Sequence, residues 1–556
     1  MWSWSVAFSQ QLNRFQIDSL YNKFIALTQP ELITQTFPVS ELTLEDKKCG
    51  FQIVTDAKSN FGSFSPEQQA NVQKILSRPV LQTSVVSPSG FFRIHYDETG
   101  SNRPSYNSSW SVEQNVNEVA RALDSVYRFE VGYLGFLPPV GDNGAGGDDK
   151  YDVYINDQNG GLYGYTDPES RVGQVNWTSF IVIDNDYTGY YSSGINGMLV
   201  TVAHEFHHSI QLGNYSIPPV AVNDSPYRDE DVFFYELTST SMEEFVFDSV
   251  NDYYAYMQSY FSSPYRAMPN QNGYNLAIWN LYLQNKFEFG ILKRQWEIIP
   301  SLNAILAINK TLLDEGSSFQ VELNKFAIWT YYTNVRTIPG LYFEEAANYP
   351  LIVPTFIPPQ QSFDATSKPT ANNFIKFTIS GTGDVLYALI TNGDASAALQ
   401  NPIPSISYSY TLYSNPTSGQ RELTSQYSST FSTGNTSFWS VSEILNNEVV
   451  RSDSILIKNI EANSSFVFPN PFRYSVSNII IRLGIKSGTE VDFQVYSAGM
   501  KLVYSTSKYV SELNYLPYID WDGLDNNKNK LASGVYIYVI KHGDEVIKGK
   551  VVIFNE

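Results

Sequence analysis

The stretch Thr201-Val-Ala-His-Glu-Phe-His-His-Ser-Ile210 decides the architecture expected of this chain. It places His204 and His208 four residues apart, one turn of an α-helix, so both imidazoles point from one face. Glu205 follows the first of them. Two His residues at this spacing can hold one Zn²⁺ from a single rigid helix, and the Glu is placed to take a proton from a metal-bound water. The sequence therefore predicts a hydrolytic zinc site.

The residues around this motif predict a buried helix. Residues 197–212 are mostly apolar, and Gly213-Asn214 follows as a helix stop. A buried helix carries two His and a Glu only at a high cost in free energy, unless a metal or polar partners pair them. His207 is expected to hydrogen-bond nearby rather than to ligate. A surface helix with incidental His residues is the alternative interpretation.

A zinc site of this kind needs a third protein ligand, and two Glu residues are candidates. The metzincin pattern requires a Gly and a third His at offsets that here hold Gln211 and Asn214, which excludes that class. Glu236 lies in an otherwise apolar stretch, where an unpaired carboxylate would be costly. Glu243 lies two turns further along roughly the same face. We expect Glu236 to ligate and Glu243 to orient a His; the reverse assignment and two ordinary surface acids are the alternatives.

Composition excludes several classes of protein. The 556 residues are too many for one hydrophobic core, so three or more folded units are expected. A net charge of −20 argues against nucleic-acid binding, and the single Cys, Cys49, excludes an intramolecular disulfide. No run of about 18 apolar residues occurs, so we expect no transmembrane segment. Only 17% of residues are charged and 39 are Tyr, which favours a β-rich, exported protein.

The predicted fold class is multidomain α+β, a zincin-like metallopeptidase domain followed by all-β domains. Ser65 to Gln68 predict a capped helix start in the prosegment-like region. Within the zincin-like domain we expect strands at residues 91–96, 151–156 and 179–184, and a helix capped by Ser111 between the first two. The order strand, helix, strand, strand, motif helix is typical of zincin upper lobes, in which an edge strand can pair with an extended peptide. Residues 225–340 are expected to form a helical lower lobe. The predicted segments are a signal-peptide remnant (1–10), a helical prosegment-like region (11–87), the zincin-like catalytic domain (88–345), a linker (346–370), a β-sandwich domain (371–460) and an Ig-like C-terminal sorting or anchoring domain (461–556).

Residues 90–335 resemble a known family. His-Glu-Phe-His-His-Ser-Ile-Gln, residues 204–211, followed by Tyr-Glu-Leu-Thr-Ser-Thr-Ser-Met-Glu-Glu, residues 235–244, resembles secreted bacterial gluzincin zinc metalloproteases. Ser239 and Ser241 depart from the family pattern, which has Ala and Trp there, and we expect this to weaken the packing of the helix. The resemblance implies zinc ligands and a general base at matching positions, namely His204, His208 and Glu236 as ligands and Glu205 as base.

The C-terminal unit resembles a second family. Its segments look like the Ig-like domain of flagellar hook-capping proteins, and related domains end many type IX secretion cargoes. The resemblance implies export, surface attachment and contact with secretion machinery, in a bacterial setting; a generic β-sandwich is the alternative. The segments are residues 467–472, 491–496, 521–525, 532–538 and 549–553.

The expected function is that of a secreted or cell-surface zinc metalloendopeptidase acting on a protein or peptide substrate. A metal-activated water would attack the peptide bond with Glu205 as general base. Tyr274, before an aromatic helix, is the candidate for stabilising the oxyanion, because zincins of this type often place a Tyr or His after the third ligand. The alternative is a non-catalytic surface binding or adhesion protein on a zincin scaffold.

Two further features are candidates for metal binding. Cys49, in Lys47-Lys-Cys-Gly50, could ligate the zinc as a latency switch, and cleavage near residue 85 would then release the prosegment; a free thiol is the ordinary alternative. The acidic loop of residues 142–149 is a candidate for Ca²⁺. Its spacing does not match an EF-hand, so a solvated turn is the alternative.

Overall fold

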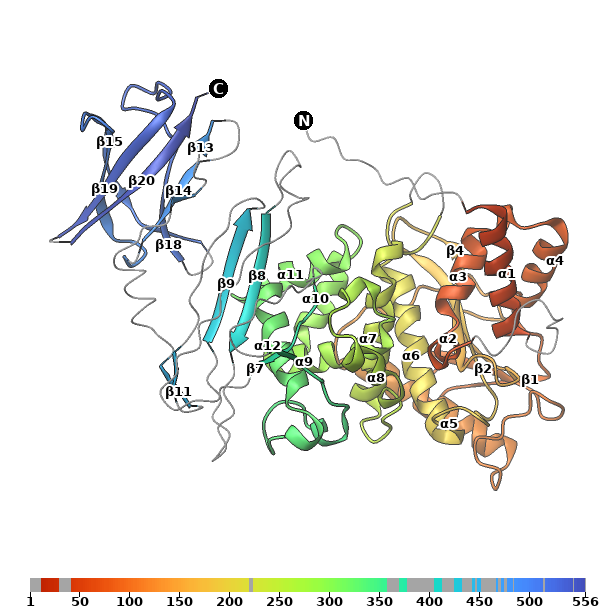
Figure 1. Cartoon of the computed structure of the whole chain (residues 1–556). Coiled ribbons are helices and arrows are strands. Elements are labelled where there is room, and N and C mark those ends of the chain that lie inside the picture. Colours follow the sequence, from red (N-terminus) through yellow and green to blue (C-terminus); the bar gives the residue numbers. More distant parts are fainter. Residues whose placement is uncertain are drawn as a thin grey trace. The chain divides into compact units, whose positions relative to one another are not determined.

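A computed structural model of the chain forms two compact units, each described here by itself (Figure 1). The first holds residues 1–377 with short stretches at 407–410 and 428–430, and the second holds the rest. The predicted signal-peptide remnant and most of the predicted 371–460 domain lie outside the described residues. Those described are 12–29, 42–219, 224–357, 370–377, 405–412, 425–432, 443–445, 448–451, 467–468, 472–474 and, with short gaps, 478–555.

A five-stranded sheet forms the centre of the first unit. Its order is β1-β2-β3-β5-β4, with β2, β3 and β5 parallel and the two edge strands antiparallel. The three parallel strands confirm the predicted ones. β4 was not predicted because Pro168 and a bulge interrupt its alternation, which an edge strand tolerates. The strands are β1 (Thr83–Val86), β2 (Phe92–Tyr96), β3 (Tyr151–Ile155), β4 (Gly164–Arg171) and β5 (Trp177–Ile183).

Helices α5 (Val112–Tyr127) and α6 (Gly194–Asn214) cover one face of this sheet, where apolar side chains of β3 and β5 meet them. The Ser111 side chain accepts a hydrogen bond from the Gln114 backbone in a capping box, which confirms the predicted start of α5. α6 ends at Asn214, as predicted, and is buried from Gly197 to Gly213 apart from Leu199. The motif helix is thus a central element of the core.

N-terminal helices cover the other face of the sheet (Figure 1), and all but the short second one contribute residues to the core there. Phe24, Leu27 and Val54 share a hydrophobic core there with Phe180 and Val182 of β5. The predicted boundary at 87/88 therefore does not separate two compact units, because the helices bury the outer face of the sheet. The helices are α1 (Arg14–Thr28), α2 (Leu44–Lys48), α3 (Phe51–Ser59) and α4 (Pro66–Ile75), with η3 (Phe61–Ser63); the predicted capping box at Ser65 is confirmed.

The predicted helical region from residue 225 to 340 is confirmed. Helix α7 packs against α6, and α9 packs against α7. Trp279 and Trp296 are buried among these helices. The elements are α7 (Val232–Val246), α8 (Tyr254–Ser262), α9 (Ala277–Phe287), α10 (Gly290–Ile298), α11 (Ala304–Asp314) and α12 (Phe319–Tyr331), with the short 3₁₀ turns η5 (Asp229–Asp231), η6 (Met268–Asn270), η7 (Tyr274–Leu276) and η8 (Asn334–Arg336). Outside this region, the π-helical turn η4 (Arg128–Tyr133) follows α5, and η9 (Ala346–Asn348) follows η8.

The C-terminal residues form two sheets around their own core. The sheets have the orders β12-β14-β18-β17 and β13-β20-β19-β15-β16. Phe493, Trp521 and Tyr538 are buried in the shared core. The strands are β12 (Val467–Phe468), β13 (Phe472–Arg473), β14 (Ile479–Arg482), β15 (Glu490–Ser497), β16 (Leu502–Tyr509), β17 (Ser511–Leu513), β18 (Leu516–Trp521), β19 (Gly534–His542) and β20 (Glu545–Phe554).

The remaining described strands form two-stranded sheets. They are β6 (Thr355–Ile357) with β7 (Ile375–Phe377), β8 (Ser405–Leu412) with β9 (Ser425–Ser432), and β10 (Glu443–Leu445) with β11 (Glu448–Arg451). Among the described residues, none of the helices has both the length and the apolar character needed to span a bilayer. The chain as described is therefore an α+β unit followed by a β-rich region.

Candidate metal centre

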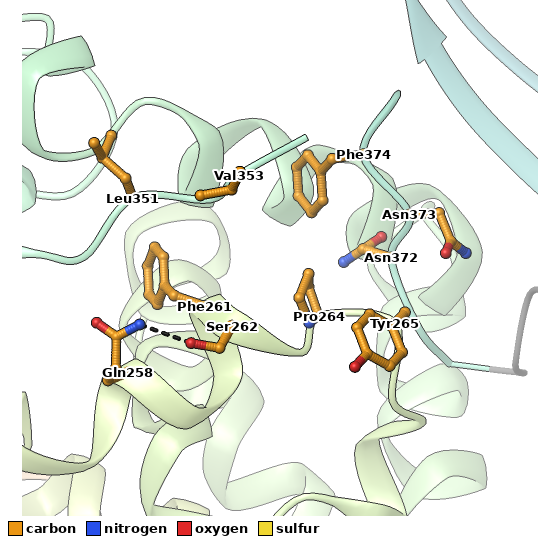
Figure 2. A pocket seen from close by; sticks show the side chains of 10 residues that line it. All are labelled: Gln258, Phe261, Ser262, Pro264, Tyr265, Leu351, Val353, Asn372, Asn373 and Phe374. Carbon is orange, nitrogen blue, oxygen red and sulfur yellow. Dashed lines mark hydrogen bonds between the residues drawn. The ribbon is translucent and has the colours of Figure 1, made fainter. Parts of the chain in front are cut away.

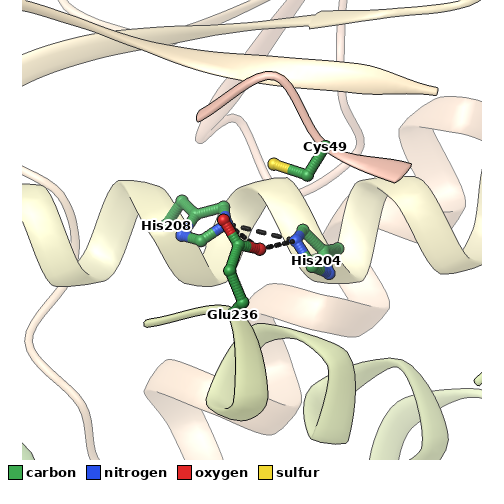
Figure 3. Close-up of side chains that lie close together, drawn as sticks. All are labelled: Cys49, His204, His208 and Glu236. Carbon is green, nitrogen blue, oxygen red and sulfur yellow. Dashed lines mark hydrogen bonds and ion pairs between the residues drawn. The ribbon is translucent and has the colours of Figure 1, made fainter. Parts of the chain in front are cut away.

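The two motif imidazoles converge on one point inside the first unit (Figure 3). His204 and His208 lie on one face of α6, and their Nε2 atoms are 3.1 Å apart. Glu236 reaches them from α7, with Oε2 at 3.2 Å from Nε2 of His204 and 3.4 Å from Nε2 of His208. All three side chains are buried. The packing of α7 on α6 therefore brings together residues that are about thirty positions apart in the sequence.

Cys49 is the fourth member of this group. Its Sγ comes from the turn between α2 and α3, and the four candidate ligand atoms all lie within 4.8 Å of one another. The backbone N–H of Phe51 donates to Sγ over 3.2 Å, and the Phe51 ring stacks on the His208 ring with centroids 4.2 Å apart. Burial, with the nearby Glu205 and Glu236 carboxylates, raises the pKa of the Cys49 thiol well above its usual range.

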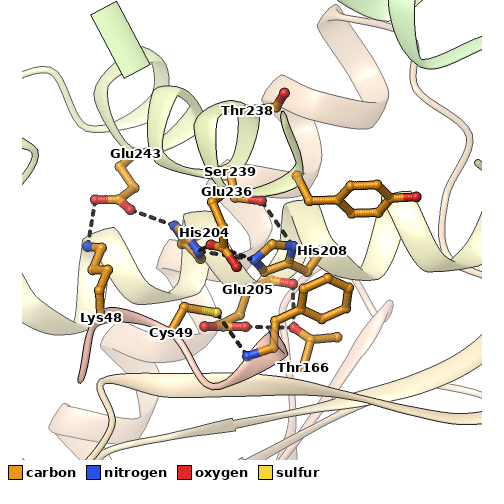
Figure 4. Close-up of polar contacts among 12 residues, drawn as sticks. Lys48, Cys49, Thr166, His204, Glu205, His208, Glu236, Thr238, Ser239 and Glu243 are labelled. Carbon is orange, nitrogen blue, oxygen red and sulfur yellow. Dashed lines mark hydrogen bonds and ion pairs between the residues drawn. The ribbon is translucent and has the colours of Figure 1, made fainter. Parts of the chain in front are cut away.

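Hydrogen bonds at the other ring nitrogen orient both imidazoles (Figure 4). His204 Nδ1 lies 2.7 Å from Oε1 of Glu243, and His208 Nδ1 lies 2.7 Å from Oε1 of Gln211. Because each acceptor holds the proton on Nδ1, both Nε2 lone pairs face the common point. Ser239 Oγ lies 3.2 Å from His208 Nδ1 and accepts from Nε2 of Gln211. Glu236 thus lies at the Nε2 atoms of the two imidazoles, and Glu243 lies at Nδ1 of His204.

The two Ser residues that depart from the family pattern are integrated into the packing of α7. Ser241 Oγ donates to the Thr238 carbonyl over 2.7 Å and accepts from Asn280 over 3.0 Å. Ser239 contacts the orienting network of His208. Both side chains are fully buried. Hydrogen bonds thus offset the loss of apolar contact that the sequence comparison led us to expect.

Glu205 points to the same centre from the β4 side of α6. Thr166 Oγ1, on β4, lies 2.8 Å from Oε2 of Glu205. Oε1 of Glu205 is buried, and within the described part of the chain it has no hydrogen-bond partner. Its carboxylate lies beside the Cys49 thiol. A buried carboxylate oxygen with no partner is costly, so a further group is expected at this point.

A buried ion-pair network continues from Glu243. Lys48 Nζ lies 2.9 Å from Oε2 of Glu243 and 2.6 Å from Oδ2 of Asp252, and all three side chains are buried. Burial lowers the pKa of Lys48, but the two carboxylates outweigh it and raise that pKa. Tyr163 adds its ring 4.9 Å from the ammonium. The residue before Cys49 is thus anchored beside the metal centre.

Charges inside the centre are coupled. Burial lowers the pKa of His204, but Glu236 and Glu243 outweigh it and raise that pKa to about 9. Burial raises the pKa of Glu236, but His208 and His204 outweigh it and lower that pKa to about 2. The imidazoles and the Glu236 carboxylate thus stabilise each other's charges. Oε1 of Glu236 is buried and has no hydrogen-bond partner among the described residues.

These residues fit a zinc ion. Bonds of about 2.0–2.3 Å to tetrahedral Zn²⁺ place the ligand atoms roughly 3–4 Å apart, and the set of two imidazoles, one carboxylate and one thiolate is a zinc donor set. A cation at the centre would account for the short approach of His204 Nε2 to His208 Nε2 and would give the unpartnered Oε1 of Glu236 a partner. Among the described residues, the group whose ligand atoms lie close enough together to hold one metal ion consists of Cys49, His204, His208 and Glu236.

Tyr274 lies beside the same centre. Its ring centroid is 6.1 Å from that of His204, and the side chain is 7% exposed. Gly273 makes this approach feasible, because it has φ of 88° and a Cβ there would lie 2.6 Å from Cβ of Glu236. Burial, with the nearby Glu236 and Cys49, raises the pKa of Tyr274 well above its usual range, so it remains a hydrogen-bond donor.

The other His residues of the first unit lie outside the centre. His207 Nδ1 contacts Oε2 of Glu130 at 2.7 Å, which confirms that it hydrogen-bonds nearby. His95 Nε2 contacts Oδ1 of Asp152 at 2.7 Å. In the acidic loop that is the Ca²⁺ candidate, Asp142 pairs with Arg78, and Asp148 pairs with Arg93 and Lys150. These carboxylates therefore have cationic side chains as partners.

Sequence reasoning missed four contributors, namely Lys48, Gln211, Thr166 and Asp252. Gln211 follows His208 by three residues, so helix spacing was a usable signal for it. The other three come from α2, β4 and the turn after α7, and their sequence separation from the motif hides them. Tertiary packing alone brings them to α6.

A separate cavity of about 340 Å³ lies between α8 and the chain around residues 351 and 372 (Figure 2). It contains none of the four candidate ligands, and its lining has amide, hydroxyl and aromatic side chains but no Asp, Glu, Lys, Arg or His. Tyr265 is its one titratable side chain. The lining residues are Gln258, Phe261, Ser262, Pro264, Tyr265, Leu351, Val353, Asn372, Asn373 and Phe374.

Comparison with protein-family models and with curated proteins gives no match. Two solved structures from Porphyromonas gingivalis align weakly. PorZ, described as an essential bacterial surface component of the type IX secretion system, is 19% identical over 17% of this chain and 12% of its own, with a TM-score of 0.14. Dimeric latent PorU is 20% identical over 16% of this chain and 9% of its own, also with a TM-score of 0.14. This chain thus spans a small part of either protein.

Proposed function

We propose that the first unit is a zinc-dependent peptidase of the gluzincin type, with a zincin-like fold. His204, His208 and Glu236 would hold the metal, and Glu205 would act as general base. The observation that carries this proposal is the convergence of three donor atoms next to a buried, unpartnered carboxylate oxygen of Glu205. A site built only to bind a metal has no use for a base at that position.

The side chains support a division of labour in peptide hydrolysis. Zn²⁺, when bound, supplies a Lewis acid that lowers the pKa of water to ~7 and polarises a carbonyl. Glu205 Oε1 takes the proton of the attacking water and gives it to the leaving amine as the C–N bond breaks. Thr166 holds the other oxygen of Glu205. Tyr274 donates a hydrogen bond to the oxyanion.

The edge strand β4 supports a peptide as substrate. An extended chain can add to a free sheet edge through backbone hydrogen bonds, and β4 lies next to the centre through Thr166. For the C-terminal unit, we propose an export and surface-attachment role, because its five segments resemble type IX cargo domains. The whole protein would then act outside the cell.

A second candidate function rests on Cys49. Four protein ligands make a closed site, which is typical of structural zinc, whereas a catalytic zinc keeps one open position. If Cys49 stays bound permanently, the first unit is a non-catalytic binding scaffold. The rival functions therefore differ in whether the fourth position opens.

The test compares Glu205→Gln with the parent chain, using zinc content and casein hydrolysis after limited proteolysis. We expect one zinc in both proteins and a loss of activity of roughly 10²–10⁴-fold in the variant. Glu230→Gln, at an exposed position, is the matched control and should behave as the parent. Absence of zinc in the parent, or full activity of Glu205→Gln, would contradict the proposal.

A further inference from the structure

We propose that the segment Lys47–Gly50 occupies the substrate cleft of this peptidase, with the Cys49 thiolate as fourth zinc ligand, and so keeps the chain latent. The inference rests on the proposed function and names its regulation. Four independent features of the segment carry it: its pairing with the edge strand, the place of its thiol, the burial of its Lys and the stacking of the next ring.

The segment lies along the edge where an extended substrate would pair. The Tyr163 backbone N–H donates to the Lys47 carbonyl over 2.9 Å, and the Gly50 N–H donates to the Gly164 carbonyl over 2.9 Å. A Cβ on Gly50 would lie 2.6 Å from Cδ1 of Leu162, so only Gly allows this approach. The segment therefore takes backbone groups that a peptide substrate would use.

The thiol of Cys49 stands where the reaction needs space. It lies within 4.8 Å of the ligand atoms of His204, His208 and Glu236, and beside the carboxylate of Glu205. A water attacking a peptide carbonyl would need the same position between base and metal. Loss of the thiol proton on coordination makes Cys49 a strong zinc ligand, so it closes the fourth position.

Buried side chains on both sides of Cys49 hold the segment Lys47–Gly50 in place. Lys48 is 2% exposed and pairs with Glu243 and Asp252, and Phe51 is buried against the His208 ring. Breaking a buried ion pair leaves uncompensated charge, so the segment does not leave spontaneously. Opening the centre requires displacement of residues 47–50, for which a chain cut is the natural trigger.

The test reads the metal's ligands directly in the full chain. With Co²⁺ as the probe metal, the parent should show a thiolate-to-metal charge-transfer band, which Cys49→Ser and Cys49→Ala lose while still binding one metal. Because Cys49 is the only Cys, the band has one possible source. Gln52→Ala, at an exposed position just outside the segment, is the matched control and should keep the band. X-ray absorption of the zinc-loaded parent should show one sulfur scatterer without any mutation.

Casein hydrolysis provides a second test of the latency proposal. Uncut Cys49→Ser should hydrolyse casein faster than the uncut parent, and the band should vanish from the parent once it is cut and active. Bound metal with no sulfur ligand would overturn this inference and leave the peptidase proposal standing. A sulfur ligand retained in the active form would overturn it as well. Absence of metal from both parent and control would overturn the peptidase proposal itself and, with it, this inference.

The burial of Lys48 carries a second inference, on substrate class. Once the segment leaves, Glu243 and Asp252 remain as two buried carboxylates that faced an ammonium group. The geometry points to a pocket that accepts a Lys or Arg side chain of the substrate, in place of Lys48. Tyr163 and Tyr256 flank that position, with ring centroids 4.9 and 5.6 Å from Nζ, and favour a cation.

This inference is tested with peptides that differ only in one Lys, Arg or Leu. In the proteolytically activated chain, Asp252→Asn should lower kcat/KM for the basic peptides by about tenfold or more and leave the Leu peptide unchanged. Asp248→Asn, at an exposed position on the same turn, is the matched control. Binding of a fluorescent Lys peptide to activated Glu205→Gln, with and without Asp252→Asn, gives a readout independent of turnover. If the activated parent and Asp252→Asn showed the same preference for basic peptides over the Leu peptide, the inference of a pocket for a basic side chain would be overturned.

Discussion

At the scale of single residues, each imidazole of the centre has one nitrogen turned to the metal position and one held by an acceptor. Glu243 holds His204 and Gln211 holds His208, each over 2.7 Å. A negatively charged acceptor also makes the imidazole a stronger ligand. In the proposed zinc site, Glu243 and Gln211 would therefore contribute to metal affinity as well as to geometry.

Glu243→Gln should weaken metal binding by about 10–100-fold, because the amide keeps the shape but loses the charge behind His204. Competition with a chelator of known affinity measures this. The adjacent Glu244→Gln is the control and should bind metal as the parent does. An unchanged dissociation constant in Glu243→Gln would show that the charge of Glu243 has no effect on the metal.

Glu244 predicts a pH dependence of stability. Burial, then the nearby Glu345 and Asp248, raise its pKa to about 9 from 4.5. Between these values the folded chain holds a proton that the unfolded chain has lost, so stability falls as pH rises, by up to about 1.4 kcal/mol per pH unit. Glu244→Gln removes this slope.

As pH rises from 5 to 9, the Tm of Glu244→Gln should therefore increase relative to the Tm of the parent. Thermal unfolding across that pH range measures the difference. Glu230→Gln, an exposed acid, is the control and should track the parent at every pH. Parallel curves for Glu244→Gln and the parent would show that Glu244 is ionised in the folded chain.

At the scale of elements, the site depends on how closely β4 approaches α6. Gly164, at the start of β4, allows this contact, because a Cβ there would lie 2.7 Å from the Val182 carbonyl oxygen and 2.8 Å from Cγ2 of Thr201. The same strand carries Thr166 to Glu205. Gly164 thus links the position of β4 to the orientation of the Glu205 side chain.

Gly164→Ala should destabilise the first unit by about 1–3 kcal/mol, because the added methyl group overpacks the contact between strand and helix. Thermal unfolding measures the effect as a lower Tm. Gly62→Ala is the matched control, since a Cβ at Gly62 meets no atom within 4 Å. Equal Tm values for the two variants would mean that β4 can move away from α6 without cost.

At the scale of the whole molecule, the two units have separate cores. The core of the C-terminal unit is built only from residues 472–553, with Phe493, Trp521 and Tyr538 at its centre. The first unit instead needs its N-terminal helices, because α1, α3 and α4 cover the outer face of the sheet. We therefore expect the C-terminal unit to fold without the rest of the chain, and the first unit to depend on its N-terminal helices.

A fragment of residues 461–556 should fold alone and unfold in one cooperative transition, because its two sheets bury a complete core. Fluorescence of the buried Trp521 and circular dichroism should report the same midpoint. A fragment beginning at residue 88 is the contrasting case, since it exposes Phe180 and Val182 on the sheet and should bind a hydrophobic dye strongly. A disordered C-terminal fragment would refute the separation of the cores.

Local sequence determined the features that depend on residues close in the chain. Helical spacing alone put His204 and His208 on one face, and the capping boxes at Ser65 and Ser111 start helices where they were predicted. The cost of an unpaired carboxylate in an apolar stretch favoured Glu236 as the ligand candidate but left Glu243 as the alternative. These are short-range effects, because helix geometry and capping act over about one turn.

Tertiary structure alone decided which distant residues meet at the motif. The packing of α7 on α6 puts Glu236 at the Nε2 atoms and Glu243 at Nδ1, a choice that spacing left open. The edge pairing of residues 47–50 with β4 brings Cys49 and Lys48 into the centre from more than 150 positions away. Such contacts depend on the burial of two faces of one sheet, and no local pattern in the sequence encodes that.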